Sequence, residues 1–506
     1  MKKIVVVGGG LAGWLTAIYL KKHLLNVEIT VIESKEIGIL GAGEGTVPYA
    51  TKVFDYLGLS AAEMIRDCDA TIKNGIKFTN WNNDGKFFYH SFFPAEPLSF
   101  SALNNKDKDE CGPIALLKNI DLSNNTYDSD FYAKLSEENK VAFIKNIQKS
   151  TKDESVYDNI GSFAVHFNAL KIANKLKNLA ELNEIKIIEG TVLDVCLDSE
   201  NNVEYVLLED NTKIYLDFVF DCTGFHKLII GKIFDAKWKS HSDKLPVDSA
   251  IPFFLEMDDS IPPYTEAIAM KYGWIWKIPL QTRYGCGYVY DSSLITEQDA
   301  AKEVEEYLGF EPEYPRKNKG SFKFKAGYYE ESWTNNCIAM GLSSGFIEPL
   351  EATAIITQIN SLDRLFKSSE WLVTKSKEYR TEYNDFVKTI NDKTASFVYF
   401  HYMTGRSDTE FWKKFTEENA PEDLKQYINV LKYRLPNKND DTFWDHVSWI
   451  VFSFINKKLN KNLIKSSIKF SSLYNQNSSN YQKFLKMQSN HIEISTDHKK
   501  FLESFK

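Results

Sequence analysis

Cysteine is scarce in this chain, and its six thiols are spread over 506 residues. They form no C-x-x-C pair and no Cys/His spacing of the kind that binds zinc, which argues against a disulfide framework and a metal site. We therefore expect reduced thiols, as in a cytoplasmic protein, and no bound metal.

Excess positive charge and long apolar runs are also lacking. The formal charge of -8 argues against binding to nucleic acid or to an anionic membrane. No apolar run is long enough to span a bilayer. The opening MKKIVVVGGG begins like a signal peptide, but its apolar run is too short and has no cleavage site, so it predicts a strand. We expect a cytoplasmic protein whose partner is a small molecule.

The first fifty residues carry a dinucleotide-binding pattern. A β-branched run ends at Val7, and Gly8, Gly10 and Gly13 then form G-x-G-x-x-G ahead of a stretch with helical spacing. The glycines permit a tight turn and let a pyrophosphate approach the helix N-terminus. Glu33 ends a second predicted strand, where it can hydrogen-bond a ribose. The pattern leaves open which dinucleotide is bound.

A later segment favours FAD. Residues 184–225 form a run of short strands with turn signals and end at D-C-T-G. This run is similar to the later part of the glutathione-reductase-type flavoprotein fold, where the chain returns to FAD. We predict an α/β, Rossmann-like FAD-binding module over 1–365, with mixed insertions at about 51–180 and 246–330. Apolar residues at three and four spacing predict a mainly helical, substrate-side region over 366–506.

Five motifs, in order, resemble those of the flavin-dependent halogenases of the tryptophan-halogenase type. They are GGGLAGW (8–14), GAGEGTVP (41–48), IKNGIKFTNW (72–81), GWIWKIPL (273–280) and NCIAMGLSSGFIEPLEAT (336–353). The resemblance implies an enzyme that uses FADH2, O2 and a halide ion (chloride, bromide or iodide) to form hypohalous acid. That oxidant would halogenate a small aromatic, indole- or phenol-like substrate. A separate flavin reductase is implied as partner, and a homodimer is compatible with the resemblance.

Two residues match the catalytic pair of that family. Lys73 matches its lysine, whose ammonium would polarise the oxygen–halogen bond of hypohalous acid or hold the halogen as a haloamine. Taken alone, a lysine before Asn-Gly would be a surface residue. Glu351 matches the glutamate, which would accept a hydrogen bond from the oxidant or take the proton from the arenium intermediate. Glu348, in the same apolar stretch, matches a structural position at a helix start.

The resemblance also assigns the remaining site positions. Thr353 and Ala354 resemble the family's halide site through their backbone N–H groups, although E-A-T-A replaces the usual E-S-T-G. Trp274 and Trp276 of W-x-W-x-I-P would share a strand face and separate the flavin from the substrate channel. The FAD positions are Gly8, Gly10, Leu11, Ala12, Gly13, Glu33, Gly43, Glu44, Gly45, Thr46, Val192, Gly341 and Leu342.

Aromatic residues define the expected substrate pocket. His90 and Phe92 match the pair that stacks on the substrate ring, and Phe443 and Trp444 match an aromatic wall. Tryptophan-specific members bind the amino acid backbone with paired tyrosines and a glutamate before the Phe-Trp pair. This chain has only Tyr433, followed by residues that include Asn439 where the glutamate would fall. An unpaired ammonium is costly to bury, so we predict a neutral indole or phenol, or a larger or carrier-tethered substrate.

Two other classes of function fit the sequence less well. A flavin-dependent aromatic monooxygenase usually carries G-D-A-A-H where this chain has G-L-S-S-G-F, and lacks W-x-W-x-I-P. A degenerate flavin-binding protein would be expected to lose Lys73 or Glu351. The two motif differences favour a halogenase over a monooxygenase, and the presence of both Lys73 and Glu351 argues against a degenerate protein.

Overall fold

The computed structural model describes residues 2–34, 43–92, 108–150, 155–315, 320–367, 370–372, 376–442, 444–472, 474–475 and 481–505. The chain forms two compact units, each built from three separate stretches. Unit 1 comprises Met1–Asp69, Phe167–Ser249 and Phe322–Ala395, and unit 2 comprises Ala70–His166, Ala250–Ser321 and Ser396–Lys506. The functional division at residue 365 stays a prediction.

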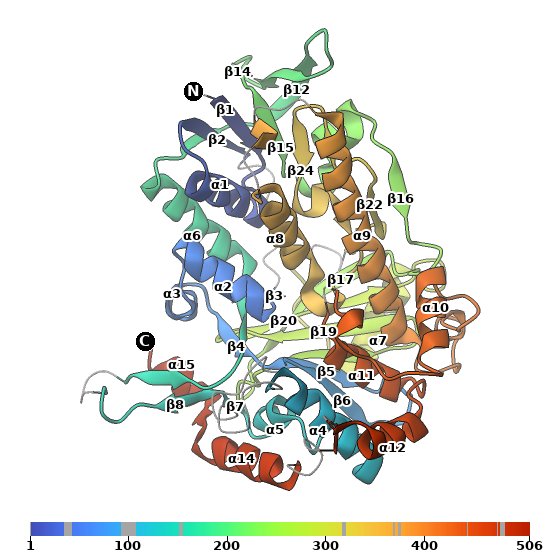
Figure 1. Ribbon diagram of the computed structural model, residues 1–506. Helices are drawn as coiled ribbons and strands as arrows, with labels where there is room; N and C mark the ends of the chain where they lie inside the picture. The colour runs from blue at the N-terminus through green and yellow to red at the C-terminus, as the bar shows by residue number, and fades with distance from the viewer. Residues whose placement is uncertain are drawn as a thin grey trace. The chain divides into compact units, whose positions relative to one another are not determined.

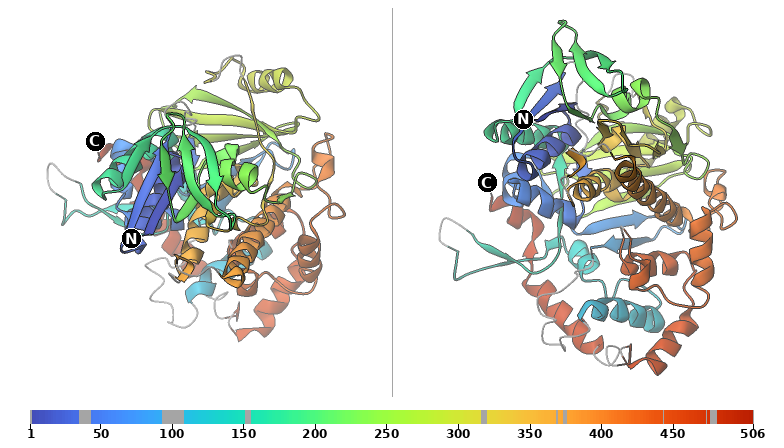
Figure 2. Two further views of the ribbon diagram at one scale, coloured as in Figure 1. Left: turned by 90° about the horizontal axis from the view of Figure 1, so that it is seen from above. Right: turned by 45° about the horizontal axis from the view of Figure 1, so that its top comes forward.

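Unit 1 contains the predicted Rossmann-like sheet. Its strand order is β11-β2-β1-β15-β24-β23, and β1, β2, β11, β15 and β24 pair in parallel. Strands from distant parts of the sequence therefore lie side by side, as the blue β1 and green β15 show in Figure 2. The strands are β1 (Lys2–Val7), β2 (Val27–Glu33), β11 (Lys186–Glu189), β15 (Phe218–Asp221), β24 (Cys337–Ala339) and β23 (Trp333–Thr334). The α/β fold class is confirmed.

Three helices of unit 1 pack together beside this sheet. The helix α1 (Leu11–His23) follows the glycine loop and contacts both α6 (Ala169–Leu182) and α8 (Thr353–Leu365) (Figure 1). Gln358 of α8 donates hydrogen bonds to the Ala12 carbonyl and to Thr16 Oγ1, at 2.8 and 2.9 Å. This contact ties the glycine-loop helix to the segment that carries Glu351.

The predicted strands of residues 184–225 form β11 and β15, described above, and a separate antiparallel meander, β12-β13-β14. Asn201 and Asn211 occupy its turns with positive φ, a conformation that asparagine tolerates well. The other elements of unit 1 are β3 (Gly43–Gly45), α2 (Pro48–Leu57), α3 (Ala61–Asp67), β12 (Val192–Leu197), β13 (Val203–Leu208), β14 (Lys213–Tyr215), β16 (Trp238–Ser240), β21 (Phe322–Lys323), β22 (Gly327–Tyr329) and β25 (Gly345–Phe346).

Unit 2 is built on a second sheet, in which strands follow the order β17-β20-β19-β18-β5-β6. The aromatic alternating stretches of the sequence form its central strands, and α7 (Glu297–Leu308) packs on β20. A separate short strand, β4, pairs antiparallel with β10. The strands are β4 (Thr71–Lys73), β5 (Gly75–Thr79), β6 (Phe87–Ser91), β10 (Ala164–Asn168), β17 (Ser249–Glu256), β18 (Thr265–Ala269), β19 (Gly273–Pro279) and β20 (Arg283–Tyr290).

The mainly helical character predicted for residues 366–506 is confirmed. The helix α9 (Lys377–Tyr402) runs from unit 1 into unit 2, where α11 (His446–Ile455) and α12 (Lys461–Phe470) pack on α4 (Lys108–Ser123). The remaining elements of unit 2 are α5 (Phe131–Glu137), β7 (Lys140–Val141), β8 (Phe143–Lys145), β9 (Tyr157–Asn159), α10 (Glu422–Val430), α14 (Tyr481–Ile494), β26 (Thr496–Asp497) and α15 (His498–Glu503).

The described residues bear on two further expectations. Five of the six cysteines have described side chains, and none of these five forms a disulfide. Within the described ranges, no helix has both the length and the apolar character needed to cross a membrane.

Candidate active site

The three glycines of the N-terminal loop have three different environments. Gly8 has φ +125°, and a Cβ added there would lie 2.3 Å from the Cys222 carbonyl oxygen. A Cβ on Gly13 would lie 1.8 Å from the Gly8 oxygen, so neither position has room for a side chain. Around Gly10, the N-cap of α1, no described atom lies within 4 Å of an added Cβ. The loop is closed inward and open at the helix N-terminus, which fits the pyrophosphate of a dinucleotide.

Glu33 lies against this loop at the end of β2. A Cβ added to Gly9 would lie 2.3 Å from the Glu33 Cβ. One carboxylate oxygen of Glu33 forms an ion pair with Lys177 of α6, a residue that the motif did not reveal. The Gly190 N–H donates to the Glu33 carbonyl at 2.8 Å, just before β12 begins at Val192. Glu33, the predicted ribose-binding residue, therefore has a cationic neighbour, Lys177, that pairs with its carboxylate.

The predicted FAD residues Gly43 to Thr46 form β3 and the turn after it. Desolvation raises the pKa of Glu44 to about 7, although part of its side chain stays accessible. The Thr46 hydroxyl lies 3.4 Å from the Thr51 hydroxyl of α2. This segment therefore combines Gly43 and Gly45 with the carboxyl group of Glu44, whose pKa lies near neutral pH.

One cavity brings together predicted flavin and halide positions. It is lined in part by Gly341, Thr353, Ala354 and Gln358. Gly341 has φ +60°, and a Cβ there would lie 2.7 Å from the Ala12 Cβ, so the 3-10 turn that also holds Leu342 packs closely on α1. Thr353 and Ala354 are the first two residues of α8, whose N-terminal N–H groups have no partner within the helix. Such a terminus suits an anion.

The turn that carries Glu351 has an unusual backbone. Glu351 has φ +66° and Ala352, the N-cap of α8, has φ +54°. Residues with a Cβ rarely adopt this left-handed region, and each such residue costs about 1–3 kcal/mol. The Glu351 side chain is buried ahead of the N-terminus of α8, and Glu348, three residues earlier, is fully buried. Strained backbone is concentrated at functional sites, where surrounding packing maintains it.

Lys73 is a buried residue of unit 2. Only 1% of its surface is exposed, which rules out a solvated surface lysine. It ends β4 opposite Ala164 of β10, and its Nζ lies 5.4 Å from the ring centroid of Phe92. A cation over an aromatic face is stabilised by the ring quadrupole. The structure thus brings two of the predicted site residues together.

An aromatic cluster links the other predicted substrate residues of unit 2. Phe397 of α9 stacks on Trp444, with ring centroids 4.2 Å apart, and lies 6.2 Å from His90. Phe452 lies 5.1 Å from His90, whose Nε2 is 2.8 Å from the Ser448 hydroxyl. Phe443 lies outside the described residues. Phe397 and Phe452 could not be identified from the sequence, because their helical spacing is also that of ordinary core residues.

Trp274 and Trp276 are neighbours on β19. Their ring centroids are 6.4 Å apart at 64°. Gly287 of β20 makes room for Trp276, since a Cβ there would lie 2.1 Å from its ring atoms. Trp274 Nε1 is buried and has no hydrogen-bond partner among the described residues. The role of these residues in a channel stays a prediction.

Asp221 is a structural residue that motif reading did not assign. It is fully buried at the end of β15, in the D-C-T-G turn. Its Oδ1 accepts hydrogen bonds from the backbone N–H and hydroxyl of Thr223, and its Oδ2 accepts from the N–H groups of Ile229 and Ile230 at 2.8 and 2.9 Å. These four bonds fix the turn whose Cys222 carbonyl abuts the glycine loop.

Two buried histidines of unit 2 flank the strand of Lys73. His498 Nε2 accepts a hydrogen bond from the Ile72 N–H at 3.0 Å, and its Nδ1 lies 2.9 Å from the Ile261 oxygen. His166 lies 3.0 Å from the Thr71 hydroxyl and 2.9 Å from that of Thr265. Burial lowers the pKa of His498 to about 4 and holds the pKa of His166 well below its usual 6.5.

We predict that His498 makes the protein sensitive to acid. The folded state keeps His498 neutral down to about pH 4, whereas the unfolded chain binds a proton near pH 6.5. Its contribution is therefore complete above about pH 6.5 and is lost as the pH falls toward 4, although the hydrogen bond to Ile261 and the charge of Asp497 oppose the lowering of the pKa. Between about pH 7 and pH 5, the native protein should lose roughly 2 kcal/mol more unfolding free energy than His498→Gln.

Urea unfolding at the two pH values measures this difference, and all other titrating groups are common to both proteins. Equal losses in the native protein and in the variant would contradict the prediction.

The sheet and the glycine loop define a dinucleotide-binding protein of the α/β class, with a buried lysine and aromatic cluster in its second unit. Comparisons with known proteins are more specific. The family model described as tryptophan halogenase matches residues 3–491. The chain belongs to the tryptophan halogenase family and is a flavin-dependent halogenase.

Relatives and a solved structure agree with this assignment. Tryptophan 6-halogenase SttH of Streptomyces toxytricini is 32% identical over 459 residues, which cover 87% of this chain and 85% of SttH. Tryptophan 7-halogenase RebH of Lentzea aerocolonigenes is 32% identical over 456 residues, which cover 85% of this chain and 82% of RebH. The structure of Tar14, a tryptophan C-6 flavin-dependent halogenase from taromycin biosynthesis, matches with a TM-score of 0.85 at 26% identity over 100% of both chains.

Proposed function

We propose that this enzyme uses FADH2, O2 and a halide ion to halogenate a neutral indole- or phenol-like ring, with Lys73 and Glu351 as its catalytic residues. The observation that carries the proposal is the burial of Lys73 beside the face of Phe92. A lysine loses favourable hydration on burial, so a position of this kind suits a chemical role better than a role in solubility. Bound FADH2 would supply, with O2 and halide, the hypohalous acid that these residues act on.

In this proposal Lys73 donates a hydrogen bond from its ammonium to the oxygen of hypohalous acid. The bond polarises the oxygen–halogen bond, so that the halogen becomes more electrophilic toward the ring. As the carbon–halogen bond forms, the oxygen–halogen bond breaks and the oxygen leaves as hydroxide, which becomes water with the proton that the ring loses. Preorganised donors in a site shielded from water stabilise developing charge strongly. The alternative, a haloamine on Nζ, would need the neutral amine as nucleophile.

Glu351 has the complementary role. Its carboxylate takes the proton that the ring carbon loses after halogen attack, and so restores aromaticity. The left-handed backbone at Glu351 and Ala352 fixes the direction in which the carboxylate projects, since few alternative conformations are open to the turn. The N–H groups of Thr353 and Ala354 at the start of α8 would bind the halide.

The first test supplies reduced flavin from outside. Only one dinucleotide pattern is present in the sequence, so the purified protein should not reduce FAD with NADH and should need a separate reductase. FADH2 from such a reductase, offered with chloride, bromide or iodide and a panel of indoles and phenols, should give products whose mass shift equals one halogen. Rapid NADH oxidation by the protein alone would contradict the reductase requirement. Hydroxylated products would favour the monooxygenase alternative.

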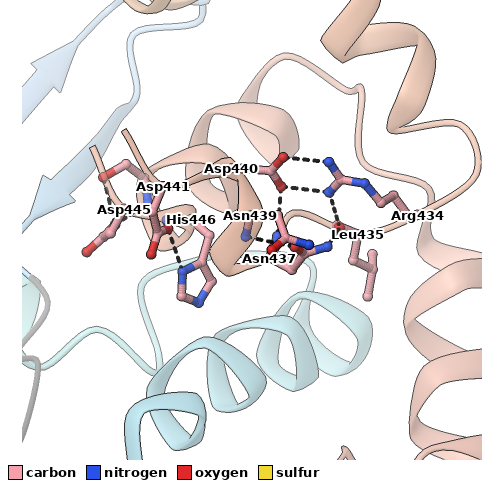
Figure 3. A network of polar contacts seen from close by, with 9 residues as sticks. Arg434, Leu435, Asn437, Asn439, Asp440, Asp441, Asp445 and His446 are labelled. Carbon is pink, nitrogen blue, oxygen red and sulfur yellow. Dashed lines mark hydrogen bonds and ion pairs between the residues drawn. The ribbon is translucent and has the colours of Figure 1, made fainter. Parts of the chain in front are cut away.

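The segment before Trp444 supports a neutral substrate. Figure 3 shows Arg434 facing Asp440, with its Nη1 and Nη2 donating to the two carboxylate oxygens at 2.7 and 2.5 Å. The Asn437 N–H also donates to Asp440 at 2.8 Å. Tyr433 is 76% exposed.

The neighbouring acids are engaged as well. Asp441 accepts hydrogen bonds from the backbone N–H and Nδ1 of His446, at 2.6 and 2.9 Å (Figure 3). The Asp445 carboxylate accepts a hydrogen bond from the Ser448 N–H. Each carboxylate of this segment thus has partners within the same chain. A substrate ammonium would have to share one of these carboxylates with the partner that it already has, so none of the three is set aside for a charged substrate.

We therefore predict that L-tryptophan is a poor substrate. In a competition between equal amounts of indole and L-tryptophan, with bromide and supplied FADH2, brominated indole should dominate. The halogen should attach to the most electron-rich ring carbon, because no backbone contact would hold the ring in another pose. Chromatography with mass detection measures both products. A clear preference for tryptophan, brominated at a single benzo-ring carbon, would contradict this prediction.

A further inference from the structure

The C-terminal residues of the chain are built into unit 2 beside the strand that carries Lys73. The strand β26 pairs antiparallel with β7, and the His498 N–H donates to the Asn139 oxygen at 2.8 Å. Phe501 of α15 stacks on Phe143, with ring centroids 4.3 Å apart. In Figure 1 the red α15 accordingly lies beside the teal strands β7 and β8. These contacts fix α15 at its place in the unit.

The side chain of His498 reaches from α15 to the backbone of β4. It is fully buried, and its Nε2 accepts the hydrogen bond from Ile72, the residue before Lys73. A ring nitrogen that accepts from an N–H group carries no proton. The proton is therefore on Nδ1, which donates to the Ile261 oxygen at 2.9 Å. The two partners select one tautomer and orient the ring.

Other contacts hold the residues on both sides of Ile72. The Thr71 hydroxyl donates to the Pro279 oxygen at 2.7 Å. The Asn74 N–H donates to the Pro263 oxygen at 2.7 Å, and its side-chain amide donates to the Lys140 oxygen at 3.0 Å. The strand is also paired with β10, where Val165 lies opposite Ile72. The imidazole supplies a further contact, to the Ile72 N–H, at the centre of this short strand.

We propose that His498 is a positioning residue for Lys73, through its hydrogen bond to the Ile72 N–H. This inference rests on the catalytic role proposed above for Lys73. The imidazole contacts neither substrate nor oxidant. It fixes the strand backbone one residue before the lysine, and so fixes the direction of the lysine side chain. A displacement of about 1 Å at a reacting group can lower a rate by roughly a hundredfold.

Three variants test the proposal. His498→Leu removes the acceptor and keeps an apolar side chain in the buried position. His498→Gln keeps an acceptor, Oε1, at the ε position of the side chain. His491→Leu is the matched control, because His491 Nδ1 lies 2.8 Å from the Met487 oxygen of its own helix, α14. The readout is halogenated product formed per enzyme-bound FADH2 in a single turnover, with the enzyme in excess over FADH2 and with bromide and indole present.

Loss of positioning should lower this ratio, whereas partial unfolding would lower the amount of bound FADH2 and the product together. The ratio should fall roughly tenfold to a hundredfold in His498→Leu. It should stay within about twofold of the native ratio in His498→Gln and in His491→Leu. A native ratio in His498→Leu, or an equal fall in His498→Gln, overturns the proposal. If His498→Leu does not fold, His498→Asn replaces it, since the asparagine side chain is too short for its oxygen to reach the Ile72 N–H. A native ratio in His498→Asn, or an equal fall in His498→Gln, would then overturn the proposal.

Lys73→Ala in the same assay separates this proposal from the one on which it rests. A native ratio in Lys73→Ala would refute the role of the lysine. A collapsed ratio in Lys73→Ala together with a native ratio in His498→Leu would refute only the positioning role of His498.

Discussion

Lys73→Ala should abolish halogenation, with a fall in product formation of roughly 10³-fold, because it removes the buried donor that activates the oxidant. FAD binding and the oxidation of supplied FADH2 should stay near native values, since the glycine loop and α8 belong to unit 1 and Lys73 belongs to unit 2. The measurement is halogenated indole by mass detection, alongside flavin fluorescence titration and peroxide release.

Lys77→Ala is the matched control for this substitution. Lys77 lies on β5, four residues further along the chain, where its Nζ pairs with Glu137 at 3.1 Å and lies 3.9 Å from the Phe87 ring centroid. Its loss should change product formation by no more than about twofold, as expected for a salt bridge near the surface. Near-normal turnover in Lys73→Ala would show that the proposed mechanism is wrong.

Glu351→Gln should lower the halogenation rate by roughly 10²- to 10⁴-fold, the usual effect of losing a general base. Glutamine has nearly the same shape, so the turn at residues 351 and 352 should be retained. The oxidation of FADH2 should continue, and peroxide or hypohalous acid should accumulate while little aromatic product forms. Single-turnover measurements of product formation quantify the loss.

Glu348→Gln provides the comparison, because Glu348 is also buried in the same stretch. We expect it to affect unfolding free energy more than the rate per folded molecule. An equal or larger fall in rate for Glu348→Gln than for Glu351→Gln would transfer the general-base role to Glu348.

Local features of the site could be predicted well from the sequence. The spacing of Gly8, Gly10 and Gly13 predicts a turn and a helix start, and both depend on backbone geometry within a few residues. The structure gives each glycine a separate steric reason, which spacing alone does not reveal. The helical periodicity after residue 360 likewise depends only on neighbours three and four residues apart.

The backbone of the Glu351 turn could not be predicted from its residues. Neither glutamate nor alanine favours positive φ, so nothing in E-A-T-A indicates two successive left-handed residues. The conformation exists because the surrounding residues of unit 1 hold it. The carboxylate was found through its apolar neighbours and a family resemblance, but its geometry came from the packed structure.

The sequence by itself determined the α/β class and the helical C-terminal region, and it singles out the glycine loop, Lys73 and Glu351 as candidate site residues. Only the tertiary structure decided which distant residues meet. His498 contacts Ile72 across 426 residues, and Phe397 joins His90 to Trp444. Each unit is assembled from three separated stretches, so its contacts depend on how whole elements pack. Short-range patterns carry information on local geometry, whereas the partner of a buried side chain is set by the packing of the complete unit.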